Sequence, residues 1–594
     1  MSFYFDPLDK AFKSVVGGVP ENQKIIFKVE SDANEVLFVY RPDEQEEKSY
    51  PMRKAQGGFF VFEHSFSKGL YWYYFVADGT VYGAGEDLVS KKESAKSFQL
   101  TVYSGDYSTP ERLKGGIIYQ IFPDRFCGVG GFEVGAGKIK RTDWGGLPTY
   151  RSADGKVYNN EFFGGNFKGI TSKLDYLKDL NVSVVYLNPI SLAYSSHRYD
   201  TSDYLSFDPV LGTEDDLKTM IAEGKKRGIS FVFDGVYNHT GADSVYFNRY
   251  GNFPEVGAYQ GAKSRYYDWY RFTRFPDEYD SWWGFESLPS IDKKCEDFQN
   301  FITDKVIAKY MDLGFFGVRL DVVDELDPAF VKNIRKAVKS KNSDGVVIGE
   351  VWEDATNKIA YGVRRAYFNG DELDSVMNYP LKNAIINYLL SGSLKEIVGV
   401  FREQINNYPK IALDTLMNVL STHDTSRIIT VLGRRYVETD KDYMKYEDLS
   451  GEYLERGKRL AEMAYAILYT VYGVPSLYYG DEAGVWGDLD PYNRKCYPWG
   501  KEDKEMLSLI KKLSDIRKSS EVFVDGEFNV LYAEKKILVF ERRKGDDNVV
   551  VALSRFESEV TVKFDSIKIE TLCGFGEGTE FKLAPDSVMI FKNV

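Results

Sequence analysis

The stretch ISFVFDGVYNH (residues 229–239) decides the fold, because an apolar run ends there abruptly in polar side chains. Two later stretches share this pattern: FGVRLDVV (316–323) and GVVIGEVW (345–352) also carry a carboxylate where the apolar run ends. Short runs of this composition are typical of strands that are buried on both faces of a parallel sheet. Parallel strands need helical connections between them, so these stretches predict an α/β domain.

The alternation of apolar runs and helical segments continues from residue 115 to 518 and gives eight predicted strands. The other five runs are GIIYQIF (116–122), VSVVYLNPI (182–190), DSVMNYP (374–380), NVLSTHD (418–424) and VPSLYYGDE (474–482). Amphipathic helices are predicted at 170–180, 214–228, 300–314, 328–340, 459–473 and 505–518. Eight strands, each followed by a helix, are the count of a (β/α)₈ barrel. An open doubly wound sheet is the alternative, but the Gly-rich turn expected after its first strand is absent from the sequence.

The regions on both sides of the barrel are predicted to be all-β, so the chain is a multidomain α/β protein. Residues 1–110 contain short β-branched and aromatic runs that are separated by turn signals, which predicts an N-terminal β-sandwich. The barrel is expected over 111–515, with a small aromatic-rich subdomain inserted at about 239–290. Short strands return in 516–594, which predicts a C-terminal β-sandwich.

Charge and cysteine content exclude several classes of function. Asp and Glu (89) outnumber Lys and Arg (76), and the net charge is −13. Nucleic acids and anionic membranes bind clustered positive charge, so neither is an expected partner. The start of the chain, MSFYFDPLDK, has neither the basic nor the apolar segment of a signal peptide. The four cysteines are widely spaced, so we expect free thiols in a cytoplasmic protein.

Polar side chains gather where the predicted strands end, which is where the reactive groups of a barrel lie. Carboxylates occur at four of these ends, and three of the four histidines of the chain belong to the same set. The set comprises His197, Tyr199, Asp234, Asn238, His239, Arg319, Asp321, Glu350, His423 and Asp424. A proton donor and an anion are what cleavage of a glycosidic bond requires. Metal-dependent hydrolysis is the competing use of His and Asp, but the sequence has no HExxH motif and no pair of histidines at helical spacing.

These segments resemble the signature regions of glycoside hydrolase family 13, the α-amylase family. The matching segments are DGVYNH (234–239), GVRLD (317–321), GEVW (349–352) and STHD (421–424), together with YQIFPDRF, HRYDTSDY and GDE. The N-terminal region resembles a family-34 carbohydrate-binding module. This layout is similar to that of the neopullulanase, cyclomaltodextrinase and maltogenic amylase group.

The resemblance implies a retaining α-glycosidase that acts on α-1,4 bonds, and also on α-1,6 bonds, in starch-type glucans, maltooligosaccharides, pullulan or cyclodextrins. Asp321 would be the nucleophile, Glu350 the general acid and then base, and Asp424 the transition-state stabiliser. The two reacting carboxylates of such enzymes lie about 5–5.5 Å apart. A glucanotransferase with the same covalent intermediate, and an inactive glucan-binding scaffold, are the two alternatives.

The resemblance also implies roles for the residues around the three carboxylates. Asp234 and Asn238 would support the site structurally, with Asp234 orienting Arg319. The residues expected to bind sugar are Tyr199, His197, His239, Arg319, His423, Trp352, Trp283 and Trp282. The alternative for the three tryptophans is that they only pack within their loops.

The sequence departs from the resembled family at three places. Val322-Val323-Asp324-Glu325 stands where the neopullulanase group usually has Val-Ala-Asn-Glu, which leaves the ratio of α-1,4 to α-1,6 cleavage open. The loop CGVGGFEVGAG (127–137) has almost no hard oxygen ligands, and residues 164–166 are Gly-Gly-Asn in place of Gly-Gly-Asp. No cofactor is therefore expected to be required, and a structural Ca²⁺ lacks its usual ligand loop. The resemblance further implies a homodimer that forms through the N-terminal domain.

Overall fold

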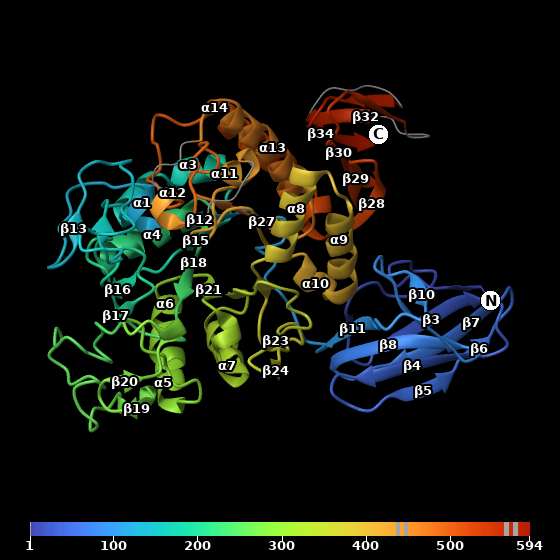
Figure 1. The fold of residues 1–594 in the computed structure, drawn as a ribbon, viewed down its shortest axis with the longest axis horizontal. Coiled ribbons are helices and arrows are strands. Elements are labelled where there is room, and N and C mark those ends of the chain that lie inside the picture. The colour runs from blue at the N-terminus through green and yellow to red at the C-terminus, as the bar shows by residue number, and fades with distance from the viewer. Residues whose placement is uncertain (1, 435–439, 445–448, 564–568, 574–579, 594) are drawn as a thin grey trace.

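The centre of the molecule is a parallel barrel. The structure is a computed structural model that describes residues 2–434, 440–444, 449–563, 569–573 and 580–593 (Figure 1). Eight parallel strands form one sheet in the order β25-β22-β21-β18-β15-β12-β27-β26, and a parallel bridge between Met377 and Met417 joins its two ends. These strands are β12 (Ile118–Ile121), β15 (Val184–Leu187), β18 (Ser230–Gly235), β21 (Gly317–Leu320), β22 (Val346–Gly349), β25 (Ser375–Val376), β26 (Met417–Val419) and β27 (Val474–Tyr478). The predicted (β/α)₈ barrel is confirmed.

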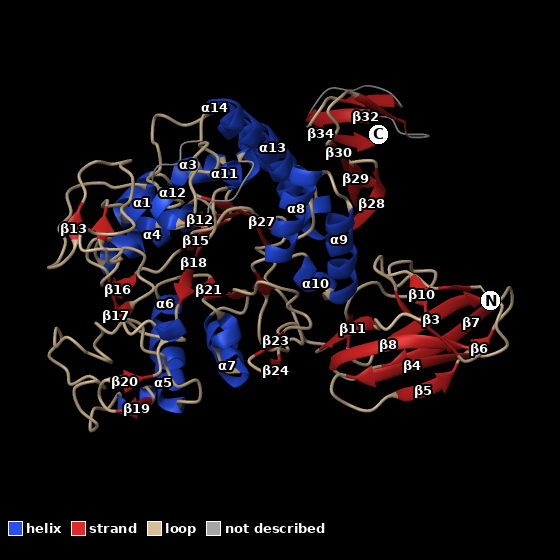
Figure 2. Cartoon of the chain, viewed as in Figure 1, coloured by secondary structure: helices blue, strands red, loops and turns tan. Residues whose placement is uncertain are grey.

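Helices surround the barrel and cover the outer face of its strands (Figure 2). The longer ones are α2 (Phe167–Ser172), α3 (Leu174–Asp179), α4 (Glu214–Lys226), α5 (Glu296–Phe301), α6 (Ala308–Asp312), α7 (Pro328–Lys341), α8 (Tyr379–Ser391), α9 (Lys395–Asn407), α11 (Ile428–Gly433), α13 (Gly451–Thr470) and α14 (Lys504–Lys518). Shorter helical turns are α1 (Pro123–Phe126), α10 (Lys410–Leu413), α12 (Lys441–Met444) and α15 (Val522–Asp525). A π-helical turn, Ile302–Ile307, joins α5 to α6.

Helices α8 and α9 fill the connection between β25 and β26, where the sequence analysis specified no helix. The side chain of Asn378 caps the start of α8 by accepting a hydrogen bond from the backbone N–H of Leu381, and Pro380 occupies the first turn. Gly392 ends the helix in the left-handed conformation, with φ of 74°. The exposed positions of α8 are Asn383, Asn387, Leu390 and Ser391, so its polar stripe is narrow and uncharged and the amphipathic pattern of its sequence is weak.

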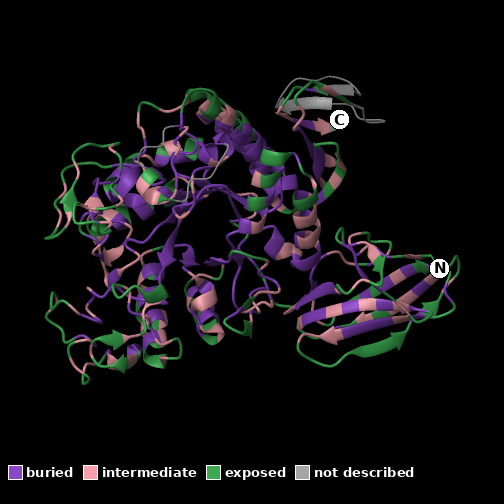
Figure 3. Cartoon of the chain, viewed as in Figure 1, coloured by how far each residue is buried: buried purple, intermediate pink, exposed green. Residues whose placement is uncertain are grey.

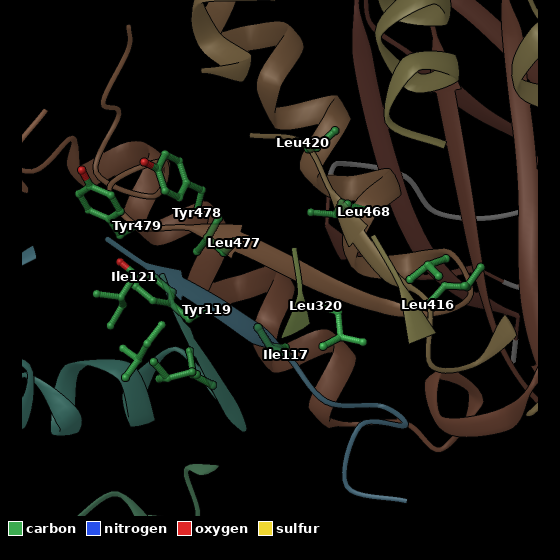
Figure 4. Close-up of a cluster of buried hydrophobic side chains, with 14 of the residues drawn as sticks. Ile117, Tyr119, Ile121, Leu320, Leu416, Leu420, Leu468, Leu477, Tyr478 and Tyr479 are labelled. Atoms are coloured by element: carbon green, nitrogen blue, oxygen red, sulfur yellow. The ribbon is translucent and has the colours of Figure 1, made fainter. Parts of the chain in front are cut away.

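The barrel strands separate two sets of buried side chains. One set points into the barrel and includes Val184, Tyr186, Val232 and Ile348. The other faces the helices and forms the largest apolar core of the molecule. Figure 4 shows part of this second core, where side chains of β12 and β27 lie near Leu468 of α13. The two-residue period of the strands therefore sends every second side chain into the barrel, where the polar site lies.

The N-terminal region forms two packed sheets with a core of their own, as predicted. One sheet has the order β1-β3-β7-β6, and in the other β8 pairs with β4, β9 and β11. Buried and exposed residues alternate along the strands (Figure 3), so one face of each sheet lies against the other. The strands are β1 (Phe3–Tyr4), β2 (Val19–Pro20), β3 (Lys24–Ser31), β4 (Val36–Pro42), β5 (Lys48–Pro51), β6 (Arg53–Lys54), β7 (Phe59–Ser65), β8 (Gly69–Ala77), β9 (Thr80–Ala84), β10 (Ser90–Lys92) and β11 (Phe98–Tyr103).

The C-terminal region consists of a five-stranded sheet, β28-β29-β30-β34-β32, and a two-stranded sheet, β31-β33. Phe528 and Phe540 pack against Phe401 of α9, which connects this region to the barrel. The strands are β28 (Glu527–Glu534), β29 (Ile537–Lys544), β30 (Asp547–Ser554), β31 (Val560–Lys563), β32 (Ile569–Cys573), β33 (Glu580–Leu583) and β34 (Ser587–Asn593). The predicted C-terminal sheet domain is therefore present.

Small elements within the barrel loops surround the carboxyl ends of the strands. The long connection after β18 contains β19 (Phe272–Arg274) and β20 (Glu278–Tyr279), with 3₁₀ turns at Tyr267–Trp269 and Trp282–Gly284. The other pairs are β13 (Ile139–Lys140) with β14 (Glu161–Phe162), β16 (Ser191–Ala193) with β17 (Thr201–Phe207), and β23 (Ile359–Ala360) with β24 (Val363–Arg364). A further 3₁₀ turn, Val323–Glu325, follows β21. Within the described part of the chain, no helix has the length and apolar character needed to span a bilayer.

Candidate active site

A single guanidinium group, that of Arg319, organises the polar side chains inside the barrel. Its Nη1 lies 2.8 Å from Asp234 Oδ1 and 2.7 Å from Asp321 Oδ1, and its Nη2 lies 2.9 Å from Glu350 Oε2. Arg319 is fully buried and pairs in register with Asp234 across β21 and β18. Asp321 and Glu350 directly follow β21 and β22, so the parallel sheet brings all three carboxyl groups to one cation.

Asp321 resists ionisation more than an ordinary aspartate. Burial raises its pKa well above the usual range, and the charges of Glu350 and Asp234 raise it further, while Arg319 opposes the shift. One buried guanidinium cannot neutralise three ionised carboxylates, and closely spaced carboxyl groups lose their protons as a coupled set. Burial and the neighbouring carboxylates therefore oppose the ionisation of Asp321, and Arg319 favours it.

Asp424 has the opposite tendency. Burial alone would raise its pKa, but the charge and hydrogen bond of His423 and the charge of Arg494 outweigh burial and lower the pKa below its ordinary range. His423 Nε2 lies 3.0 Å and Arg494 Nη2 lies 3.5 Å from the carboxylate. The anionic form of Asp424 is thus favoured, whereas burial disfavours the anionic form of Asp321. Sequence reasoning missed Arg494, because it belongs to the loop after β27 and not to a strand end.

The hydroxyl of Tyr199 connects the two halves of the site. It donates to Asp234 Oδ2 at 2.7 Å, receives a hydrogen bond from Asn188 at 3.0 Å, and contacts Nε2 of His423. The ring of Tyr199 also stacks on the imidazole of His423, with centroids 5.1 Å apart and planes inclined by 6°. Gln120 approaches Nδ1 of His423 at 2.9 Å, so the histidine is fixed at both nitrogens.

The other two predicted histidines lie next to Tyr199 and are held neutral. The Nε2 atom of His239 lies 3.1 Å from the carbonyl oxygen of Tyr199, and Nδ1 of His197 accepts from the Tyr199 backbone N–H at 3.1 Å. Burial lowers the pKa of His239 to about 4 and that of His197 to about 3. His197 and Arg494 also line a small hollow between the loops after β12, β15 and β27.

Backbone strain positions a donor on Glu350. Val322, the residue after Asp321, has a left-handed backbone with φ of 36°, which is unfavourable for a β-branched residue. In this conformation its N–H donates to Glu350 Oε2 at 2.9 Å. The indole N–H of Trp352 donates to the other oxygen, Oε1, at 3.1 Å. Sequence reasoning predicted the location of Trp352 but not the contact made by Val322, because nothing in a Val-Val pair indicates positive φ.

The predicted tryptophans have different surroundings. Trp352 is 44% exposed and stacks on Tyr379, with centroids 3.8 Å apart. Trp282 stacks on His239 at 5.2 Å, whereas Trp283 is 79% exposed and lies 5.9 Å from Trp282. The structure therefore brings Trp282 and Trp352 into contact with site residues and leaves Trp283 at the surface.

Asn238 and Glu325 extend the site away from the guanidinium. The amide of Asn238 donates to Glu325 Oε2 at 3.1 Å, and the indole of Trp282 donates to Glu325 Oε1 at 3.2 Å. Glu325 lies in the 3₁₀ turn that follows Asp321. The predicted supporting role of Asn238 thus corresponds to a contact with a residue that the sequence analysis did not single out.

The residues near the family's usual calcium loop do not suit a cation. The side chain of Asn166 caps α2, accepts from the N–H of Val129 at 3.3 Å, and donates to the Val129 carbonyl oxygen at 3.0 Å. Asparagine ligates a cation through its amide oxygen, and Oδ1 of Asn166 already accepts from the backbone N–H groups of Gly169 and Val129. Among the described residues, no three His, Cys, Asp or Glu side chains are grouped closely enough to hold a metal ion.

A (β/α)₈ barrel whose strand ends carry three carboxylates around an arginine, with aromatic rings beside them, defines an enzyme of the carbohydrate-cleaving class. Comparison with known families agrees: residues 120–495 match the catalytic domain of α-amylase. The chain belongs to the α-amylase family, glycoside hydrolase family 13.

Curated relatives and solved structures are similar over most of the chain. A cyclomaltodextrinase from Thermoanaerobacter pseudethanolicus is 30% identical over 88% of this chain and 87% of its own length. An amylopullulanase from Thermoanaerobacterium saccharolyticum is 35% identical over 84% of this chain, but the match covers only 43% of that longer protein. The structure of the type III pullulan hydrolase from Thermococcus kodakarensis covers all of both chains, with 25% identity and a TM-score of 0.72.

Proposed function

We propose that the protein is a retaining glycosidase that hydrolyses α-1,4-glucosidic bonds, and α-1,6 bonds as a second linkage, in starch-type glucans, maltooligosaccharides, pullulan or cyclodextrins. The observation that carries the proposal is the contact of Arg319 with both Asp321 and Glu350, beside an ionised Asp424. Retaining glycosidases need a nucleophilic carboxylate and a carboxylic acid on either side of one bond.

Asp321 is assigned as the nucleophile. Arg319 holds its Oδ1, so Oδ2 is the oxygen that attacks the anomeric carbon and forms the covalent glycosyl ester. The attack needs an ionised Asp321, although burial raises the pKa of this group. The single proton of the pair must therefore reside on Glu350 when the bond breaks, and Arg319, which contacts both, stabilises the remaining negative charge.

Glu350 is assigned as the acid and then the base. It gives its proton to the departing sugar oxygen, and in the second step it removes a proton from the water that attacks the ester. The N–H groups of Val322 and Trp352 fix both of its oxygens. Asp424 stays anionic and does not attack; its role is to bind sugar hydroxyls and to stabilise the positive charge of the transition state.

Binding of the sugar before the cleaved bond is assigned to the aromatic and imidazole groups around Tyr199. The stacked Tyr199 and His423 offer one apolar face, and the neutral His239 and His197 offer hydrogen bonds without a charge that must be desolvated. The substrate class is supported by the names of the relatives, which are a cyclomaltodextrinase, a maltogenic amylase and a pullulan hydrolase.

The test is the variant Asp321→Asn with starch, pullulan, β-cyclodextrin and maltotriose as substrates. We expect turnover to fall at least about 10⁴-fold, with binding of maltooligosaccharide retained, and we expect the wild type to release products of α configuration. Full activity of the variant, or release of the β-anomer, would contradict the proposal. Accumulation of longer transfer products in place of reducing ends would favour the glucanotransferase, and binding without turnover by the wild type would favour the scaffold.

Three further properties concern cofactors, assembly and location. Activity is proposed to need no calcium or other cofactor, since the amide oxygen of Asn166, the atom that would ligate a cation, already accepts from two backbone N–H groups. A homodimer that forms through the N-terminal domain rests on the resemblance alone, and elution at the monomer mass of 67.9 kDa would refute it. A cytoplasmic location is supported by a 31% identical Bacillus subtilis relative, which is described as an intracellular maltogenic amylase, and fractionation of cells tests it.

A further inference from the structure

A small hairpin in the loop after β22 carries an exposed aromatic ring at its tip. Strands β23 and β24 contain two residues each, and Tyr361 lies between them with φ of 51°. The Tyr361 side chain is 66% exposed, and its hydroxyl donates to Glu325 Oε1 at 2.9 Å. Lys293 Nζ lies 4.0 Å from the centre of the ring. The ring is therefore held by its hydroxyl and by one face, while much of its surface is open to solvent.

The base of the hairpin is bound by the N-terminal domain of the same chain. Arg364 Nε donates to Asp43 Oδ2 at 2.7 Å, and its Nη2 donates to Oδ1 at 3.2 Å. The indole of Trp72 in β8 donates to Asp43 Oδ1 at 2.7 Å. Burial alone would raise the pKa of Asp43, but the hydrogen bonds from Arg364 and Trp72 outweigh it and lower the pKa. The contact is thus a fork-shaped ion pair that is maintained at any working pH.

A second contact attaches the start of the same loop to the same domain. The side-chain amide of Gln99 in β11 donates to Thr356 Oγ1 at 2.7 Å and accepts from Asn357 at 2.7 Å. Gln99 is buried, and Figure 1 shows β23 and β24 beside the edge of the N-terminal sheets that contains β8 and β11. A hairpin of two-residue strands is not stable by itself, and the positive φ of Tyr361 adds strain. The hairpin therefore depends on the N-terminal domain for its shape.

The loop that contains the hairpin lies on the side of the site where the departing sugar binds. This loop begins with Glu350 and Trp352, and the proton of the acid must reach the oxygen of the departing sugar. The departing sugar therefore lies along this loop. Tyr361 reaches the site through Glu325, which also receives the hydrogen bond of Trp282.

We propose that the Tyr361 ring is a stacking surface for a glucose unit beyond the cleaved bond, and that the N-terminal domain, through Asp43, is the positioning element that holds this ring in place. The inference rests on the proposed glycosidase function and adds a binding site to it. Asp43 touches neither the substrate nor a carboxylate of the site; it acts through Arg364 and the hairpin.

The experiment compares two substrates that differ only after the cleaved bond. An aryl α-maltoside places a small chromophore there, whereas maltopentaose places further glucose units there. For Tyr361→Ala and Asp43→Ala we expect the KM for maltopentaose to rise roughly 2- to 12-fold, the effect of losing one aromatic contact. The kcat of both substrates and the KM for the aryl maltoside stay near wild type, and the double variant loses no more than Tyr361→Ala alone.

A matched control is available in another ion pair between the same two domains. Asp6 accepts from Arg402 of α9 at 2.8 Å through both oxygens, away from the hairpin. Asp6→Ala should lower the melting temperature about as much as Asp43→Ala and leave the ratio of the two KM values unchanged. If Asp43→Ala unfolds the chain, Asp43→Asn provides a second variant, because it keeps an acceptor for Trp72 and removes the charge that pairs with Arg364. It should raise the KM ratio in the same direction as Asp43→Ala, and an unchanged ratio in a folded Asp43→Asn enzyme would contradict the inference.

Several results would overturn the inference while the glycosidase assignment survives. These are an unchanged KM ratio in Asp43→Ala or Tyr361→Ala, an equal loss on both substrates, or the same shift in Asp6→Ala. A wild type that cleaves neither substrate would instead refute the proposed function, and the inference would fall with it. The two failures are therefore distinguishable in one set of assays.

Discussion

Replacing Arg319 by methionine tests the electrostatic basis of the site. Arg319 contacts Asp234 at 2.8 Å, Asp321 at 2.7 Å and Glu350 at 2.9 Å, and it is fully buried. Each such pair is worth about 4 kcal/mol at an effective dielectric constant near 20, offset by desolvation and by repulsion among the carboxylates. Removal of one partner from a buried pair costs about 3–5 kcal/mol of unfolding free energy, and we expect Arg319→Met to fall in that range. The same loss in the transition state lowers kcat/KM by about 10²- to 10⁴-fold.

The sign of the pH dependence separates this mechanism from simple loss of packing. Burial already raises the pKa of Asp321, and without Arg319 it rises further. The folded variant then holds a proton that the unfolded chain releases, so its stability is highest at low pH and is lost as pH rises. In urea titrations, the difference from wild type should therefore be larger at pH 8 than at pH 5, and the acid limb of kcat/KM should move to higher pH.

A second buried arginine provides the comparison. Arg335 of α7 pairs with the buried Asp374 on the outer side of the barrel and donates to the Ser108 carbonyl at 3.1 Å. Arg335→Met should cost a similar free energy of unfolding and leave the pH dependence of kcat/KM unchanged. The reasoning would be refuted by an Arg319→Met enzyme with an unshifted acid limb, or by a stability loss that is equal at both pH values.

Three further predictions follow from individual contacts. Val322→Gly relieves about 1–2 kcal/mol of left-handed strain but gives the unfolded chain a similar gain in backbone entropy, so the free energy of unfolding should change little. The kcat should fall at constant KM, because the backbone N–H that donates to Glu350 is held less firmly. An unchanged kcat would contradict this role. His239→Asn should reduce the loss of stability in acid. Burial lowers the pKa of His239 to about 4, so the neutral imidazole contributes stability that is present above pH 6.5 and is lost as pH falls through 4. Urea midpoints at pH 7 and pH 4 should therefore differ less in the variant than in the wild type. Dialysis against a strong chelator should change neither the melting temperature nor the rate of maltopentaose cleavage, and a fall in either that calcium reverses would contradict the assignment of Asn166.

The sequence predicted the barrel and the residues gathered in it for one physical reason. Parallel strands that are buried on both faces are almost wholly apolar, so each polar residue at their ends is conspicuous, and the sheet brings those ends together. All eight predicted strands are present, and Asp321, Glu350 and Asp234 meet at Arg319 as their positions indicated.

What the sequence could not predict depends on contacts between distant segments and on backbone angles. Arg494 reaches Asp424 from the loop after β27, and Tyr361 reaches Glu325 from a hairpin that is held by Asp43. None of these pairs has a periodic pattern along the chain. The left-handed Val322 was also invisible, because valine is among the residues least expected at positive φ.

The charge balance of the site explains why so many of its neighbours are needed. Three buried carboxyl groups share one guanidinium, so the cluster cannot lose all its protons without a large penalty, and it keeps the proton that the acid step consumes. Asp424 would join this competition if it could take up the proton, but His423 and Arg494 lower its pKa and exclude it. The hydroxyls of Tyr199 and Tyr186 both donate to Asp234 Oδ2, so Asp234 is held in place by its neighbours and by Arg319. Asp321 and Glu350, which also contact Arg319, are then the two carboxyl groups left to act on the glycosidic bond.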